Sequence, residues 1–491
     1  MDFPGEALGD ALQEKGFQLL PGSFREIPGQ GWWFAARGPG RKAVGWVGEA
    51  ELPLRIAPLL PEPIPVGRYR VNLYPWMWDN YLALRSLLSL VPQRCDRPAS
   101  FGAGDRLGMA TAAQIAALRG YPVFPVLAQQ SPRELARTGR DFQAVLLDAV
   151  WGVLEAGYTG PFGADADHLQ EEEQLRAAAA AGYSLYTFDL RRALARGPCP
   201  WEALPALARS VVAELAGRRL ETPEGPWILQ ESALQAAACR YAPALEDVVR
   251  GAGILRDQGI DADLEVSVDE TEEETTPEAH AFIAVYLQRR GVALWSLAPR
   301  FPGIFEKAVD YEGDVARFAR AVTLHAAVAR AFGGHRLSLH SGSEKFRILP
   351  IFREATGGCF HVKTSGTTWL QAVRVIARVH PPFFAELYAI ARAHLEESRR
   401  DYPIALRPED LPSALPGDPE AALADRAVRQ LFHISYGVLL RERGVAIREL
   451  LESHKAEHDA AIRENLERHL EILLKSAGDG RGARIDPGPS G

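Results

Sequence analysis

The sequence predicts an α/β protein built on a (β/α)8 TIM-type barrel, with a small N-terminal β-containing cap and C-terminal helices. Three observations support this fold class. Short apolar segments recur eight times between about residues 98 and 370, helical stretches separate them, and polar residues close them. Alternating β and α units give parallel strands with helices outside. A barrel carries its catalytic groups at the carboxyl ends of such strands.

The predicted strands follow one another along this central part of the chain. In order, they cover residues 100–105, 122–129, 160–168, 184–189, 264–270, 293–298, 337–342 and 360–366. An open, doubly wound sheet shows the same alternation and also binds ligands at its strand ends. The number of predicted strands favours the closed barrel.

The predicted barrel domain, residues 96–380, follows an N-terminal cap of residues 1–95. Within the cap, the apolar runs 31–37 and 42–47 flank a Gly-Pro-Gly-Arg turn, a pattern typical of a β-hairpin. The proline-rich run 59–66 indicates an extended connector between the hairpin and the barrel.

Two further regions follow the predicted barrel. Residues 381–477 form a helical extension, because apolar residues recur at helical spacing over 421–441 and 445–475. We expect these helices to pack on the barrel, where they also offer a contact for a homo-oligomer. Residues 478–491 are rich in Gly, Pro and Ser and are predicted to be disordered.

The composition excludes several classes of partner. Hydrophobic residues make up 47% of the chain and charged residues 24%, which is typical of a globular protein with a large core. The net charge is -8 and no basic stripe alternates with aromatic residues, so nucleic acid is not an expected partner. No window approaches the roughly 18 apolar residues of a membrane span. The first residues do not resemble a secretory signal, so we expect a cytoplasmic protein.

The four cysteines are widely spaced and include no CxxC pair. This spacing argues against a zinc ribbon and against a disulfide scaffold. It indicates buried thiols in a reducing cytosol for Cys95, Cys199, Cys239 and Cys359.

The third predicted strand ends in the sequence Asp165-Ala166-Asp167-His168. An acid beside an imidazole at a strand end can supply a base and a metal ligand together, because histidine is a common ligand of transition metals. The alternative is structural: the aspartate would cap a helix that begins near Leu169.

The fifth predicted strand, residues 264–270, alternates between apolar and polar residues. Its apolar face would meet the surrounding helices, and its polar face, made of Glu265, Ser267 and Asp269, would point into the barrel. Inward polar groups are costly unless they pair, bind metal or reach solvent at the mouth. Asp269 or Glu270 is therefore a candidate functional residue, and a layered polar network is the alternative.

The loops after the last two predicted strands are candidates for binding an anion. In this fold, backbone amides and hydroxyls of these loops commonly hold a phosphate or carboxylate. Lys363 would suit a carboxylate substrate, or it could be a Schiff-base nucleophile if its pKa were depressed. The predicted substrate-binding residues of these loops are Ser341, Ser343, Lys345, Lys363 and Ser365.

The first predicted strand runs into a glycine-rich loop, residues 102–108. The loop has GxGxxxG spacing, and no strand about twenty residues further on ends in an acid, so it matches a dinucleotide fingerprint poorly. We expect Asp105 and Arg106 on the substrate side and no nucleotide cofactor. The acid-rich run 270–278 is expected to be mostly solvated and to cap the helix after Pro277.

Six motifs together resemble the motif set of the tagaturonate/fructuronate epimerases, over roughly residues 95 to 380. They are SFGAGDRLG, GPFGADADHL, EVSVDETEEETTPEAH, APRFPGIFEKAVDYEGD, SLHSGSEKF and FHVKTSGTTWLQAV. The resemblance implies an isomerase on a barrel that uses a divalent metal, such as Zn, Mn, Ni or Co, to interconvert D-tagaturonate and D-fructuronate. Relatives act on tagatose and fructose. The sequence departs from the family pattern at residues 272–274 and 308–309, and these departures bear on the expected substrate more than on the expected chemistry.

The resemblance also implies roles for particular residues. It makes Asp167 a base, Glu270 an acid, and His168 and His340 metal ligands. We add Asp310 as a third ligand, because a two-histidine site usually needs a carboxylate. Strand alternation favours Asp269 over Glu270 as the acid, so Asp269 is kept as a substrate-binding candidate.

The chemistry of the implied reaction agrees with these residue types. The two ketouronates differ at a carbon β to the ketone, which simple enolisation cannot invert. A base that deprotonates the hydroxyl there would allow retro-aldol cleavage, rotation of the aldehyde fragment and re-addition, and a divalent metal would stabilise the negative charge. The alternatives are transient oxidation by bound NAD, a metal- or lysine-dependent aldolase acting on a sugar phosphate, and a barrel that only binds a sugar acid.

Overall fold

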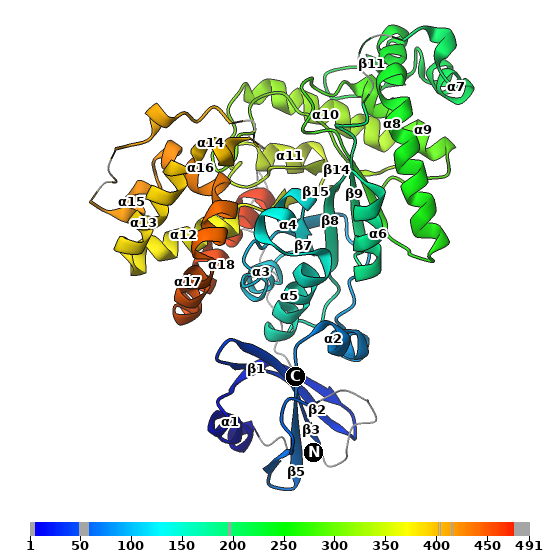
Figure 1. Cartoon of the computed structure of the whole chain (residues 1–491). Helices are drawn as coiled ribbons and strands as arrows, with labels where there is room; N and C mark the ends of the chain where they lie inside the picture. The colour runs from blue at the N-terminus through cyan, green and yellow to red at the C-terminus, as the bar shows by residue number, and fades with distance from the viewer. Residues whose placement is uncertain are drawn as a thin grey trace.

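The computed structural model describes residues 5–48, 58–194, 197, 199–400, 402, 404–413, 415 and 417–475. Figure 1 shows an N-terminal sheet in blue, a central barrel with helices around it, and a group of C-terminal helices in yellow to red. The predicted disordered tail, 478–491, lies outside the described residues. Among the described helices, none is both long enough and apolar enough to span a bilayer.

The centre of the molecule is a closed barrel of parallel strands. The strands are β6 (Ala99–Ala103), β7 (Phe124–Gln130), β8 (Gly163–Leu169), β9 (Leu185–Asp189), β12 (Asp263–Ser267), β13 (Ser296–Ala298), β14 (Arg336–Leu339) and β15 (Phe360–Thr364). Each overlaps one predicted strand, so the (β/α)8 barrel is confirmed. The open-sheet alternative is wrong, because β15 pairs in parallel with β6 and closes the sheet.

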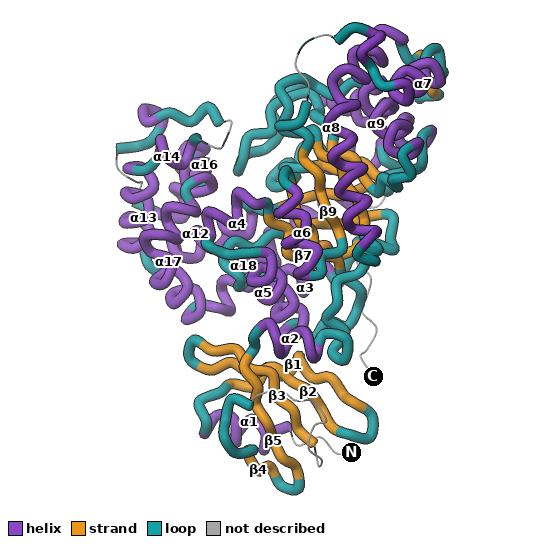
Figure 2. Tube along the Cα trace, turned by 45° about the vertical axis from the view of Figure 1, so that its right-hand side comes forward, coloured by secondary structure: helices purple, strands orange, loops and turns teal. Residues whose placement is uncertain are grey.

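Helices surround the barrel on its outside, as Figure 2 shows with purple helices around orange strands. They are α3 (Thr111–Leu118), α4 (Pro132–Thr138), α5 (Phe142–Glu155), α6 (Glu172–Ala181), α8 (Glu231–Asp257), α9 (Pro277–Arg289), α10 (Val315–Ala331), α11 (Leu349–Ala355) and α12 (Thr367–Val379). A further helix, α7 (Ala206–Leu215), belongs to the insertion between β9 and β12 and packs on α8 and α9 instead. Local sequence sets several starts: Ser131 and Glu134 form a capping box at α4, and Thr276 caps α9 before Pro277.

The N-terminal part is an antiparallel sheet in the order β1-β2-β3-β5-β4. The predicted hairpin is confirmed by the pairing of β2 (Gly31–Gly38) with β3 (Arg41–Gly48). The remaining elements of this part are β1 (Gln18–Ile27), β4 (Ile64–Val66), β5 (Tyr69–Pro75), α1 (Gly5–Glu14) and α2 (Trp78–Leu84). The end of the predicted connector is thus the short strand β4, which pairs with β5.

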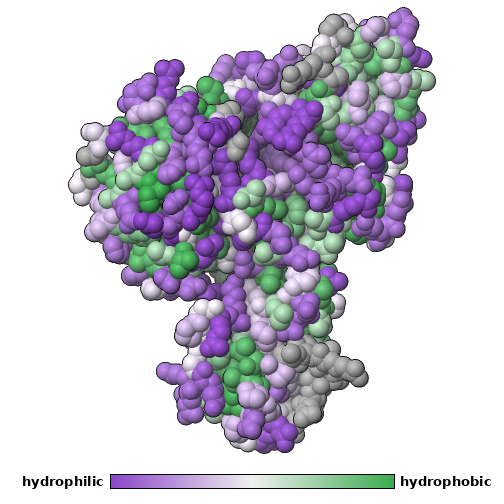
Figure 3. Space-filling view, viewed as in Figure 1, coloured by the Kyte–Doolittle hydropathy of each residue, from purple (hydrophilic) through white to green (hydrophobic). Residues whose placement is uncertain are grey.

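The N-terminal lobe contacts the barrel layer through α5. Arg37 pairs with Glu155 at 2.5 Å, and Lys42 pairs with Asp148 at 2.9 Å. Figure 3 shows this lobe at the bottom, joined by a narrow waist to a larger body whose visible face is mostly hydrophilic.

The C-terminal part consists of α13 (Pro381–Ala393), α14 (Leu395–Arg399), α15 (Pro419–Ala422), α16 (Arg426–Ile434), α17 (Tyr436–Ser453) and α18 (Lys455–Leu474). The two long helices predicted over 421–441 and 445–475 are each interrupted. Asp425 starts a new helix by accepting a hydrogen bond from the Val428 amide, and α17 ends before His454. Buried residues of α18 pack in one cluster with residues of β6, α3 and β15.

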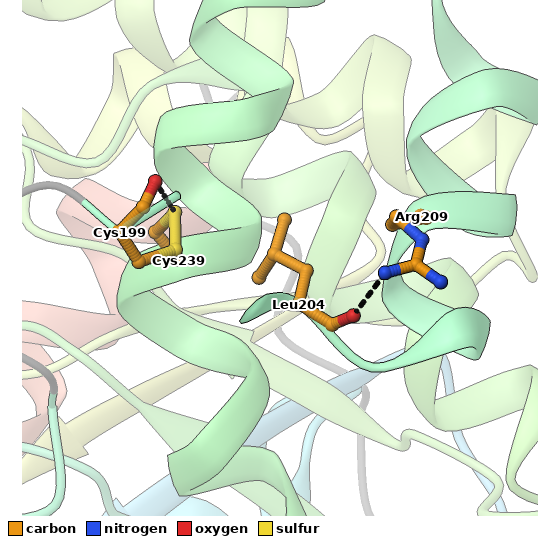
Figure 4. The surroundings of a disulfide bond; sticks show 4 residues. All are labelled: Cys199, Leu204, Arg209 and Cys239. Atoms are coloured by element: carbon orange, nitrogen blue, oxygen red, sulfur yellow. Dashed lines mark hydrogen bonds between the residues drawn. A yellow bond between two sulfur atoms is a disulfide. The ribbon is translucent and has the colours of Figure 1, made fainter. Parts of the chain in front are cut away.

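The cysteine prediction is wrong for one pair. Cys199 and Cys239 form a disulfide, which joins the segment before α7 to the long helix α8 (Figure 4). In the same view Arg209 of α7 donates a hydrogen bond to the Leu204 carbonyl at 2.8 Å. The cysteines are 40 residues apart, and an insertion between β9 and β12 brings them together. The described thiols that stay free are Cys95 and Cys359.

Three buried histidines between α9, α10 and the start of β14 predict a pH-dependent stability. Nδ1 of His280 lies 3.0 Å from Nδ1 of His325, and Nε2 of His280 lies 2.6 Å from Nε2 of His335. Burial lowers the pKa of His280 well below its usual range and lowers the pKa of His325 and of His335 to about 4. The unfolded chain therefore binds more protons than the folded chain below about pH 6.5.

Lowering the pH from 7 to 5 should accordingly reduce the free energy of unfolding, by at most about 1.4 kcal/mol per pH unit for each of these histidines. Thermal denaturation of His325→Gln should show a weaker dependence of the midpoint on pH than the wild type. His454→Gln, at a partly exposed position on the C-terminal helices, serves as the matched control. A midpoint equally sensitive to pH in all three proteins would contradict the prediction.

Candidate active site

A cavity at the carboxyl ends of the barrel strands gathers most of the predicted site residues. Those that line it are Arg106, Asp167, His168, Glu270, His340, Ser341, Ser343, Lys345, Lys363 and Ser365. They come from loops and strand ends that are distant in sequence, which is the arrangement expected of a barrel enzyme. Asp105, Asp269 and Asp310 do not line this cavity.

Asp167, His168 and His340 are the candidate metal ligands. One possible donor atom from each lies within 4.8 Å of the others. Consecutive residues of a regular strand face opposite sides, but His168 has a φ of 54° and the pairing of β8 with β9 shifts register after Ala166. This irregularity lets Asp167 and His168 both line the mouth, next to His340 at the end of β14. A helix-capping role for Asp167 finds no support, because α6 begins only at Glu172.

The two histidines sit among carboxylates. Nδ1 of His168 lies 3.5 Å from Asp189, and Nδ1 of His340 lies 3.3 Å from Asp269. Both nitrogens are buried, and neither makes a well-formed hydrogen bond to any described residue. Burial opposes protonation, yet the adjacent carboxylates raise the pKa of His168 to about 10 and that of His340 to about 9.

A divalent cation fits this donor set. Two imidazoles and one carboxylate are typical ligands of a transition metal, and the raised histidine pKa values show that the surrounding carboxylates favour positive charge at this point. A bound cation would supply that charge and engage nitrogens that are otherwise unsatisfied. Glu265, whose Oε1 lies 2.6 Å from Nε2 of His340, would then orient that ring through its other nitrogen, an arrangement common in metal sites. Asp269 would add negative charge beside Nδ1 of His340.

Lys363 occupies the centre of the barrel beneath these ligands. Its Nζ lies 2.7 Å from Asp165, 2.8 Å from Asp167 and 2.7 Å from Glu265, and it donates to the Thr187 hydroxyl at 2.7 Å. Burial opposes its charge, but the three carboxylates raise the pKa of Lys363 well above its usual range. A Schiff-base nucleophile needs the opposite shift, so the lysine-dependent aldolase finds no support in this geometry.

The polar face of β12 points into the barrel, as strand alternation predicted. Glu265 is fully buried, and its Oε1 lies 2.6 Å from Nε2 of His340. Ser267 donates a hydrogen bond to Asp269 at 2.5 Å. Glu265 was predicted to face inward, but it was not among the predicted site residues. An acid in the middle of a strand that points into the barrel was the sequence feature that could have identified it.

Of the two neighbouring acids Asp269 and Glu270, only Glu270 lines the cavity. Its carboxylate lies 3.2 Å from Arg133 and 2.6 Å from Arg191. Burial raises its pKa, but His168 and Arg133 outweigh burial and lower it, so the group is ionised at neutral pH. Asp269 contacts His340 instead of lining the cavity. Between the two acids that sequence reasoning left open, the geometry favours Glu270.

Two other predicted residues, Asp105 and Asp310, lie away from their expected contacts, and a third, Arg106, is engaged by another residue. Asp105 accepts hydrogen bonds from the amides of the loop that follows it, so it shapes that loop. Asp310 accepts from the amides of Tyr311 at 2.7 Å and Arg347 at 3.3 Å, and the structure does not bring it to the two histidines. Arg106 lines the cavity but is paired with Glu134 at 3.0 Å.

Comparison with known proteins supports the assignment suggested by the fold and the site. The tagaturonate epimerase family model matches residues 61–473. A tagaturonate/fructuronate epimerase of Thermotoga maritima is 39% identical over 419 residues, covering 80% of this chain and 85% of that protein. Crystal structures of the fructuronate-tagaturonate epimerase of Cohnella laeviribosi, native and with glycerol, are 31% identical and superpose with a TM-score of 0.85. The superposed region includes 95–96% of this chain and 99% of each of those chains.

The fold and the site define a barrel enzyme with a candidate metal centre at its catalytic mouth. The chain belongs to the tagaturonate epimerase family, and it is an epimerase of the isomerase class.

Proposed function

We propose that this protein interconverts D-tagaturonate and D-fructuronate. The observation that carries the proposal is that Asp167, His168 and His340 meet Glu270 in one cavity, on a chain that belongs to the tagaturonate epimerase family. The relatives named above support the choice of substrates. The related ketohexoses tagatose and fructose stay the alternative predicted substrates.

Asp167, His168 and His340 would hold the divalent ion, with Zn, Mn, Ni or Co as candidates. When bound, the ion supplies Lewis-acid stabilisation of negative charge on substrate oxygens. Asp167 takes the place first given to Asp310 in this ligand set. Lys363 and the two histidines together outweigh burial and lower the pKa of Asp167 to about 2, which suits a permanent anionic ligand better than the base first predicted.

Glu270 would move the proton. Its ionised carboxylate takes the proton of the hydroxyl on the carbon to be inverted. The electron pair of that oxygen forms the new carbonyl, the adjacent carbon–carbon bond breaks, and the electrons of that bond move to the ketone fragment, which becomes an enolate. After the aldehyde fragment turns, the carbon–carbon bond forms again on the other face and Glu270 returns the proton. Glu270 thus acts first as base and then as acid. Arg133 and Arg191 hold its carboxylate at the cavity wall.

The rival route is transient oxidation by tightly bound NAD. Nucleotide released from the denatured pure protein would favour that route over retro-aldol cleavage. A cytoplasmic location and a homo-oligomer formed through the C-terminal helices also stay predictions. Because cytoplasmic disulfides are uncommon outside thermophiles, the redox state of Cys199 and Cys239 in thiol-blocked cell extracts bears on the location.

The proposed function predicts the outcome of a direct assay. Metal-loaded enzyme is incubated with D-tagaturonate, and separately with D-fructose, and each reaction is followed by carbon NMR. We expect D-fructuronate signals from the first, no conversion after treatment with a chelator, and recovery when the ion is restored. The absence of new ketose signals from both sugars would contradict the proposed function.

A further inference from the structure

Lys307 is a cation of the cavity that forms no ion pair with any carboxylate in the described part of the chain. It lies in the loop between β13 and α10, at the mouth of the barrel, and lines the same cavity as Asp167, His340 and Glu270. Its Nζ donates one hydrogen bond, to the Ser341 hydroxyl at 2.6 Å. Its ammonium also helps to lower the pKa of Glu270 by charge, without forming an ion pair with it.

The other cations around the cavity are already engaged. Lys363 contacts three carboxylates, Arg106 pairs with Glu134, and Arg133 pairs with Glu270. Lys345 is buried and donates to three backbone carbonyls, those of Glu306, Val309 and Ser343. The carboxylate predicted to lie near Lys363 would therefore find that ammonium occupied, whereas Lys307 has two protons left to donate.

The backbone around Lys307 is held in place on both sides. Lys345 binds the carbonyls of Glu306 and Val309, and Arg429 donates to the Ala308 carbonyl at 2.7 Å. Ala308 adopts a φ of 66°, which is uncommon for a residue with a side chain and costs free energy that these contacts must offset. The loop is thus fixed so that Lys307 contacts Ser341, before any ligand binds.

Ser341 places a hydroxyl beside the Lys307 ammonium. It directly follows His340 and has a φ of 53°, and its oxygen accepts a hydrogen bond from Lys307. Its own hydroxyl proton can therefore be donated to a ligand. Burial and the nearby Lys307 ammonium also lower the pKa of Lys345 to about 7, as expected where positive charge is in excess. An anion bound here would relieve that repulsion.

We propose that Lys307 and the Ser341 hydroxyl bind the carboxylate of the substrate, and that Lys307 sets the preference of the enzyme for a ketouronate over a neutral ketohexose. This assignment rests on the proposed function, because it names the group that recognises one end of that substrate. A second cationic region, with Arg191, Arg192 and Arg400 around an adjoining cavity, is the competing position for the carboxylate.

The test compares wild type, Lys307→Met and Arg192→Gln. A charged hydrogen bond lost from a binding site weakens binding by about 10- to 100-fold. We expect Lys307→Met to lower kcat/KM for D-tagaturonate by that factor, mainly through KM, and to leave kcat/KM for D-tagatose unchanged. Arg192→Gln should match the wild type. Equal losses for both sugars in Lys307→Met, or a selective loss of the uronate in Arg192→Gln, would overturn the assignment.

A binding measurement separates this inference from the proposed function. D-Gluconate and neutral D-glucitol are titrated calorimetrically into metal-loaded enzyme, which requires no turnover. We expect the wild type to bind gluconate more tightly than glucitol and Lys307→Met to lose about 10- to 100-fold for gluconate alone. If the wild type does not discriminate between them, the carboxylate site is wrong even if the enzyme epimerises. If it discriminates through Lys307 but turns over neither sugar, the proposed function fails and the anion site stands.

Discussion

Replacement of Glu270 by glutamine is expected to lower kcat for D-tagaturonate by about 10²- to 10⁴-fold, the usual contribution of a positioned acid–base group. Glutamine keeps the shape of the side chain and can still accept hydrogen bonds from Arg133 and Arg191, but it cannot take up the hydroxyl proton. Because Glu270 is not one of the candidate ligands, the metal content should equal that of the wild type. Steady-state kinetics and elemental analysis of the same preparations check both expectations.

Asp269→Asn is the matched control, because it makes the same replacement, a carboxylate by an amide, at the neighbouring acid. Asp269 lies beside His340 and outside the cavity, so its loss should weaken metal binding by about 10- to 100-fold. Added metal should then restore much of the activity of Asp269→Asn and none of the activity of Glu270→Gln. If added metal rescues Glu270→Gln instead, the roles of the two acids are reversed from those proposed.

The sequence left the choice between Asp269 and Glu270 open for a physical reason, and these paired variants test it. Strand alternation assigns every second residue to one face, and it correctly turned Glu265 and Ser267 inward. β12 ends at Ser267, so alternation no longer fixes the directions of Asp269 and Glu270. The same limit applies at β8, where the register shift and the positive φ of His168 place consecutive residues on one face.

Other features depended on contacts that no local pattern encodes. Lys307 lies in a loop without periodicity, and its position depends on Lys345 and Arg429, which are distant in sequence. The Cys199–Cys239 disulfide depends on how the insertion between β9 and β12 folds. By contrast, the eight strands were predictable, because short segments with apolar residues at alternate positions recur between helical stretches and are followed by polar residues at the mouth.

Lys363→Met is expected to have the largest effect on stability. Lys363 is 2% exposed, and its removal would leave Asp165, Asp167 and Glu265 close together in the barrel without their shared cation. Breaking a buried ion pair by removing one partner costs about 3–5 kcal/mol, because the remaining charge is desolvated and unpaired. Guanidinium denaturation should show this loss. Lys42→Met, which removes the partly exposed pair with Asp148, should cost at most about 1 kcal/mol.

A second variant keeps the prediction testable if Lys363→Met does not fold. Adding Asp165→Asn removes one of the buried charges that the lysine neutralised, so the double variant should be more stable than Lys363→Met alone. Burial already raises the pKa of Asp165 to about 7 with the lysine present, which makes its charge the most costly of the three to retain without it. If Asp165→Asn lowered stability further, the three carboxylates would not depend on Lys363 for their charge balance.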